Sequence, residues 1–271
     1  MKYFATILLS FMFYSCSNSI ANNVDDIVPK ITPKNTDSVA LVKPIVPTSK
    51  PQLLFSKDEL MGKLTPKNDS SFIKIEKKYT NKSNIYLRKR AYAWYCKMYA
   101  EAAKEGLQLK IVSAFRSNYH QKLIWEAKWT GKRKVGGKKL NISITDELLR
   151  AKEILKYSSM PGSSRHHWGT DIDIYDLNNS TFESGTGLKV YEWLQQNAAK
   201  FGYYQVYTFG RDVGYNEEKW HWSYLPIAKP MLDAYRANIS IKDFSGFKGA
   251  NTADHVHIIY NYVLGINPEC L

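Results

Sequence analysis

The sequence has few of the features that mark disulfide-stapled, membrane-spanning or disordered proteins. Its 271 residues include three cysteines, too few for a disulfide framework. No apolar run reaches the roughly 20 residues of a membrane-spanning helix. Acidic side chains are also scarce, with 25 Asp and Glu against 38 Lys and Arg and a net charge of +13. Because 44% of the residues are hydrophobic, the chain can bury a substantial core, and its positive charge favours an anionic partner such as nucleic acid, a membrane or cell-wall polymer.

The first 56 residues differ in composition from the rest. Lys2 and the apolar run 3–14 are typical of a signal peptide, so we expect residues 1–16 to direct export to the periplasm or cell envelope. Cys16 is similar to the processed cysteine of bacterial lipoproteins, and its lipidation would attach the protein to a membrane; the alternative is an ordinary cleaved signal. Residues 17–56, with proline among small polar residues, predict a disordered tether. Given export and the lack of a recognised motif, we expect no binding to nucleic acid.

Residues 57–224 mix helical and strand patterns without regular βαβ alternation. This mixture predicts an α+β fold, in which a small antiparallel sheet is flanked by helices. We expect helices over residues 87–105, 118–129, 146–157 and 188–200, and strands over residues 107–114, 170–175, 203–208 and 220–224. Residues 131–139, rich in glycine and lysine, predict a solvated loop.

Residues 225–271 are expected to form a C-terminal extension that packs on the domain, with the apolar run 258–263 docked on the core. Its two histidines, in the segment 254–257, are expected to be structural. Cys96 and Cys270 leave two alternatives open, a disulfide in an oxidising compartment or one buried and one terminal thiol.

The first of two histidine-bearing stretches lies at residues 161–175. His166 and His167 precede Asp171 and Asp173, which fall on a predicted strand. Because alternate residues of a strand share a face, both carboxylates point to the same side. This arrangement brings carboxylates beside a histidine-bearing loop.

The second stretch places His221 in an aromatic strand, shortly after Glu217 and Glu218. One histidine from each stretch and one aspartate would make a set of two nitrogen ligands and one oxygen ligand, which leaves tetrahedral zinc a position for water. A nearby glutamate that is not a ligand would then be the general base.

These stretches resemble the zinc D-alanyl-D-alanine carboxypeptidases of the VanY type, in the clan that also includes lysostaphin-like peptidases and the hedgehog domain. The shared motifs, in the family's order, are Ser113-Ala-Phe-Arg116-Ser117-x-x-x-Gln121, Ser164-x-His166-x-x-Gly169-x-x-x-Asp173, Trp193-Leu-x-x-Asn197-Ala-x-x-Phe201-Gly202 and Glu218-x-Trp220-His221.

The resemblance implies a Zn²⁺ enzyme that removes C-terminal D-alanine from peptidoglycan stem peptides. It implies His166, Asp173 and His221 as the zinc ligands, since His166, unlike its neighbour, has the motif's spacing to Asp173. It also implies Glu218, three residues before His221, as the catalytic base.

For the substrate, the resemblance implies that Arg116 binds the terminal carboxylate or stabilises the oxyanion, and that Gln121 and Ser164 position the peptide. Asp171 departs from the family pattern and would either support one of the first two histidines or face solvent. D,D-carboxypeptidase activity is favoured. The alternatives are an L,D-carboxypeptidase, a cross-link endopeptidase and a non-catalytic zinc-containing wall-binding module. The oligomeric state is left open.

Overall fold

A computed structural model of the chain describes residues 55–271. The expected export signal, Cys16 and all but the last two residues of the expected tether lie outside the described residues. Within residues 55–271, no helix combines the length and apolar character needed to cross a bilayer.

The described part of the chain is an α+β fold, as the sequence predicts. Its α-helices are α1 (Lys57–Leu60), α2 (Lys89–Lys104), α3 (Asn118–Trp129), α4 (Leu140–Ser143), α5 (Glu147–Leu155), α6 (Gly185–Asn197) and α7 (Leu225–Asn238). Its strands are β1 (Phe72–Lys74), β2 (Tyr86–Arg88), β3 (Ile111–Ser113), β4 (Asp171–Ile174), β5 (Tyr203–Gln205) and β6 (His221–Tyr224). A short 3-10 helix, Arg165–Trp168, precedes β4, and a π-helix covers Ile258–Val263.

The expected elements are present, with α3 matching its predicted range and the strands shorter than predicted. In the predicted strand 107–114, alternation does bury Leu107, Leu109 and Ile111. Only residues 111–113 form β3, which pairs with β4. The predicted strand is longer because alternation indicates which side chains are buried, and not which backbone groups find a partner. The two-stranded sheet β1–β2 was not predicted.

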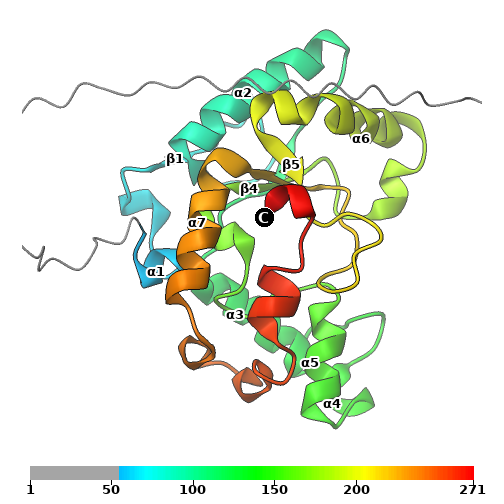
Figure 1. Cartoon of the computed structure of the whole chain (residues 1–271). Helices are drawn as coiled ribbons and strands as arrows, with labels where there is room; N and C mark the ends of the chain where they lie inside the picture. The colour runs from blue at the N-terminus through cyan, green and yellow to red at the C-terminus, as the bar shows by residue number, and fades with distance from the viewer. Residues whose placement is uncertain (1–54) are drawn as a thin grey trace, which may run out of the picture. The chain divides into compact units, whose positions relative to one another are not determined.

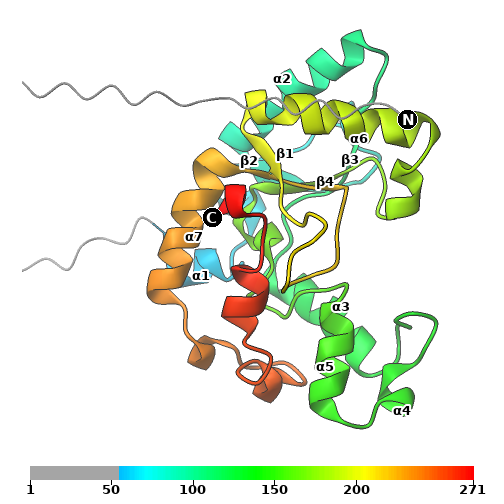
Figure 2. The same ribbon diagram turned by 45° about the vertical axis from the view of Figure 1, so that its right-hand side comes forward.

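The main sheet has the order β3-β4-β6-β5, and all its neighbours are antiparallel. One face carries apolar residues of β4 and β6 that share a core with α2 and α6, namely Ile172, Ile174, Trp222 and Tyr224. Figures 1 and 2 show α2 and α6 on one side of the sheet and α3, α5 and α7 on the other. Alternation therefore directs the remaining side chains of β4 and β6 away from that apolar core.

The C-terminal residues 225–271 belong to a second core cluster. Helix α7 follows β6 directly and buries Met231 and Leu232, in the same cluster as Ile258 of the π-helix. His255 and His257 are exposed and lie outside the group of residues able to hold a metal. Cys96 and Cys270 are both free thiols, Cys270 being buried in this cluster while Cys96 packs against the other.

Candidate metal centre

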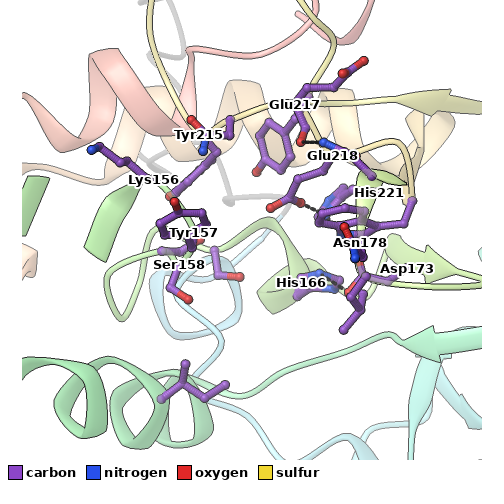
Figure 3. Close-up of a pocket in the computed structure, with 18 of the residues that line it drawn as sticks. Lys156, Tyr157, Ser158, His166, Asp173, Asn178, Tyr215, Glu217, Glu218 and His221 are labelled. Atoms are coloured by element: carbon purple, nitrogen blue, oxygen red, sulfur yellow. Dashed lines mark hydrogen bonds and ion pairs between the residues drawn. The ribbon is translucent and has the colours of Figure 1, made fainter. Parts of the chain in front are cut away.

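Strand register brings two of the predicted ligands together. In the β4–β6 ladder, Asp173 lies opposite His221, and directly opposed side chains on one face are close neighbours. His166 comes from the 3-10 helix just before β4, and its Nε2 lies 3.4 Å from Oδ2 of Asp173. Nδ1 of His221 lies 3.3 Å from Oδ1 of Asp173. All three residues are buried and offer ligand atoms within 4.8 Å of one another (Figure 3).

The turn between His166 and Asp173 depends on Gly169. Its φ of +66° lies in the left-handed region that glycine adopts at no steric cost. A Cβ at this position would lie 2.3 Å from Cε1 of Phe72. Glycine is therefore the residue that fits this reversal without strain, and the reversal sets the histidine beside the strand.

The buried donor set fits zinc. Among the described residues, Nδ1 of His166 and Oδ1 of Asp173 are buried without a hydrogen-bond partner, although buried polar atoms are normally satisfied. Two imidazole nitrogens and a carboxylate oxygen are a common donor set for catalytic Zn²⁺. Burial opposes ionisation of Asp173, but His166 and His221 hold its pKa below the usual range, so it is an anionic ligand at neutral pH.

Asp171 is buried and hydrogen-bonds His221 on the side of the ring away from Asp173. Both alternatives from the sequence, support of His166 or His167 and exposure to solvent, are therefore wrong. Oδ2 of Asp171 accepts hydrogen bonds from Nε2 of His221 at 2.9 Å and Nε of Arg165 at 3.0 Å. Two hydroxyl groups donate to Oδ1, those of Thr170 at 2.7 Å and Ser223 at 2.6 Å. Burial raises the pKa of Asp171, but Arg165 and His221 more than offset this and lower it. The ionised Asp171 thus orients the His221 ring, with Nδ1 toward Asp173.

His167 forms hydrogen bonds with two backbone groups and is not part of the metal group. Its Nε2 accepts a hydrogen bond from the backbone N–H of Gly162 at 3.1 Å, which leaves Nδ1, 2.6 Å from the carbonyl oxygen of Arg116, to donate. Burial lowers the pKa of His167 to about 3, so the ring is neutral. It therefore ties the loop before the 3-10 helix to the backbone at Arg116.

Glu218 stands beside the metal group without being part of it. Its Oε2 lies 3.3 Å from Nδ1 of His221, and Figure 3 shows its carboxylate directed toward that ring. The N–H of His221 donates to the carbonyl of Glu218 at 3.3 Å, and the N–H of Glu218 donates to the carbonyl of Tyr207. This tight turn before β6 explains why the three-residue spacing sets Glu218, and not Glu217, next to the histidine.

Arg116 and Gln121 form a pair. Nη1 of Arg116 donates to Oε1 of Gln121 at 2.9 Å, and Nη2 donates to Oγ of Ser113 at 3.2 Å. Nε2 of Gln121 donates to the carbonyl of Ser159 at 2.6 Å, and the Gln121 side chain is fully buried. Gln121 therefore holds the guanidinium in place, while Arg116 and Ser164 line the adjoining cavity.

The cavity has a volume of about 520 Å³ and extends from the metal group to α3 and to residues 156–159, which follow α5. Several of its lining residues escaped the sequence analysis, among them Lys128, Arg133, Tyr207 and Tyr215. Lys128 had one available signal, since it lies seven residues after Gln121 and so on the same face of α3. Trp220 also lines the cavity, whereas Trp222 is buried in the core.

Comparisons with known proteins agree on one family. A family model described as D-alanyl-D-alanine carboxypeptidase (VanY) matches residues 84–227, slightly more than half of the chain. YodJ of Bacillus subtilis, named as a carboxypeptidase, is 31% identical over 148 residues, which are 52% of this chain and 46% of YodJ. A D-alanyl-D-alanine carboxypeptidase of Enterococcus faecalis is 34% identical over 71 residues, 26% of this chain and 25% of the relative. The chain thus spans less than two thirds of the length of these curated relatives.

Two solved structures are also similar. VanYB in complex with D-alanine-D-alanine has a TM-score of 0.45 and 19% identity, covering 64% of this chain and 87% of that one. The LdcB LD-carboxypeptidase has a TM-score of 0.47 and 22% identity, covering 69% of this chain and 79% of the other.

Proposed function

Because this chain belongs to the D-alanyl-D-alanine carboxypeptidase family, we propose that it is a zinc-dependent carboxypeptidase that removes the C-terminal D-alanine from peptidoglycan stem peptides. One observation carries the proposal. The buried group of His166, Asp173 and His221 has Glu218 at its side and opens on a cavity that Arg116 also lines. Metal ligands, a base and a guanidinium for a carboxylate are the parts that such a reaction needs.

The chemistry divides between the metal and the chain. When bound, zinc supplies a Lewis acid that polarises the scissile carbonyl and lowers the pKa of a water molecule. Glu218 takes a proton from the attacking water and passes it to the departing amine. Its side chain suits this role because it is largely buried, at 17% exposure, and is held close to His221.

In this proposal, Arg116 binds the terminal carboxylate of the substrate and so gives the enzyme its carboxypeptidase specificity. A fixed guanidinium binds a carboxylate through two parallel hydrogen bonds. Gln121 and Ser113 hold the Arg116 head group from the protein side. Peptides whose C-terminus is free would therefore be preferred over cross-linked peptides. Peptidoglycan lies outside the cytoplasm, and the signal-like run at residues 1–16 suits export to that compartment.

The test is mass spectrometry of defined muropeptides after incubation with the purified protein, with zinc and with chelator. We expect the pentapeptide to lose one alanine in a chelator-sensitive reaction. Shortening of the tetrapeptide alone would show L,D activity, and cleavage of the cross-linked dimer an endopeptidase. Binding of zinc without cleavage of any of the three would contradict the proposal and favour a wall-binding module.

Two variants sharpen this test. Glu218→Gln should keep its zinc and lose turnover by roughly a hundredfold or more, because the general base is gone. Glu217→Gln is the matched control with the same change of charge one residue away, and it should keep most of the activity. Equal losses in both variants would remove Glu218 from the mechanism.

A further inference from the structure

We propose that Lys128 and Arg133 form a second anion subsite of the cavity, which binds a carboxylate of the substrate peptide other than its terminal carboxylate. The inference rests on the proposed function and adds a determinant of substrate choice to it. Both side chains line the same cavity as the metal group.

Helix α3 carries Lys128 and the residue that holds Arg116, two turns apart. Gln121, which holds Arg116, lies in the first turn of α3, and Lys128 lies two turns later on the same face. At 1.5 Å per residue the two positions are about 10 Å apart along the helix axis. Ile124, between them, also lines the cavity.

Lys128 is a buried cation with little to offset its charge. Its exposure is 7%, and Nζ donates to Oγ of Ser158 at 2.5 Å. Within residues 55–271, no carboxylate forms an ion pair with it. An ammonium has three donors, so hydrogen-bonding capacity is left for a ligand. A buried charge without a partner is costly, and an anion bound here would relieve that cost.

The surrounding charges favour an anion further. Burial lowers the pKa of Lys128 to about 8, and the positive charges of Arg133 and Arg116 lower it in the same direction. Glu218 is the negative charge that acts on Lys128 and raises this pKa. The charges of Lys128, Arg133 and Arg116 repel one another, and a bound carboxylate would be attracted by all three.

The metal group and the hydrogen-bond partner of Lys128 lie on opposite sides of the cavity. In Figure 3, His166, Asp173 and His221 lie on one side, and Tyr157 and Ser158, the partner of Lys128, lie on the other. The carboxylates of Asp173 and Glu218 thus belong to the metal side. The anionic groups of a peptide are its carboxylates. The Lys128 side of the cavity is suited to bind a carboxylate other than the terminal one, which Arg116 binds.

The second carboxylate can belong to a residue before the scissile bond or to the leaving residue, and the experiment separates the two. Synthetic peptides ending in D-alanyl-D-alanine are made in pairs, one with a side-chain carboxylate and the other with the carboxamide in its place. One pair carries the difference before the scissile bond. A second pair replaces the terminal residue with D-glutamate or D-glutamine.

In one of these pairs we expect kcat/KM to be about tenfold to a hundredfold higher for the carboxylate, mainly through KM, as for one charge-assisted hydrogen bond. Lys128→Met should abolish this preference, so that kcat/KM becomes equal for the carboxylate and carboxamide peptides of that pair. Arg133→Gln, on an exposed loop residue, should reduce the preference without risk to folding. Lys132→Met, an exposed neighbour outside the cavity lining, is the control for net charge and should keep the preference.

Binding provides a readout that does not need turnover. Calorimetry with the Glu218→Gln variant and the same peptides should show the same preference for the carboxylate. Equal affinities within both pairs would overturn the subsite, even if D-alanine is released normally. If the variant prefers the carboxylate peptide in binding but the wild-type protein cleaves none of the peptides, the subsite is supported and the proposed function is contradicted. Equal losses on carboxylate and carboxamide peptides in both Lys128→Met and Arg133→Gln would also overturn it.

Discussion

Replacing Asp171 with asparagine tests whether the buried network behind the metal group holds it in place. Asp171 is fully buried and accepts four hydrogen bonds, two of them from Arg165 and His221. An asparagine has nearly the same shape, and its NH₂ group can face the two hydroxyl groups, which are able to accept. The substitution therefore removes the negative charge while disturbing the packing little.

Two magnitudes follow from these contacts. Arg165 has 1% exposure and would keep a buried charge without its partner, which costs about 3–5 kcal/mol of the free energy of unfolding. The orientation of His221 would lose its charged support, and loss of such a support weakens metal binding by roughly 10- to 100-fold. Asp171→Asn should thus lower both the stability of the metal-free protein and its zinc affinity.

Urea denaturation of the chelated protein measures the first quantity, and competition with a coloured zinc chelator the second. Asp233→Asn, at an exposed position of α7, is the matched control for the loss of one negative charge. A stability loss below about 1 kcal/mol, together with zinc affinity within about twofold of wild type, would refute the assigned role of Asp171.

Further predictions concern the turn and the loop around the site. His167→Ala should lower the free energy of unfolding by about 2–5 kcal/mol, because two backbone groups lose their partner and a buried cavity opens; a urea titration showing a loss below 1 kcal/mol would contradict this. Burial holds the pKa of His167 at about 3, so below pH 6.5 the unfolded chain binds a proton that the folded chain does not. The stability gap between wild type and His167→Ala should therefore shrink by about 2 kcal/mol from pH 7 to pH 5, and a constant gap would refute the neutral ring. Gly169→Ala should cost about 1–3 kcal/mol more in thermal or urea unfolding than Gly106→Ala, since both have positive φ but only the first Cβ meets Phe72; equal losses would exclude the contact. Arg116→Ala should raise KM chiefly for peptides with a free terminal carboxylate, and equal effects on cross-linked peptides would make its role structural.

Helix α3 and strand β4 illustrate what local pattern can predict. The predicted range of α3 is confirmed, and Ser117 caps the helix by accepting a hydrogen bond from the N–H of His120. In β4, alternation of carboxylate and isoleucine correctly indicates which side chains enter the core. The short strands β1 and β2 carry too few residues for such a pattern, so their pairing could not be predicted.

The α+β class, the family and the three residues of the metal group were all predictable from the sequence. They were predictable because they depend on motif spacing along short, continuous segments. The hydrogen bond between Asp171 and His221 could not be predicted, since that contact crosses from β4 to β6 and depends on their register. The position of Lys128 in the cavity also depends on the tertiary structure. The spacing along α3 does not show whether this lysine faces solvent or the site, and the packing of α5 and the following loop beside α3 determines it. Contacts between distant segments are set by docking of whole elements, which no local spacing encodes.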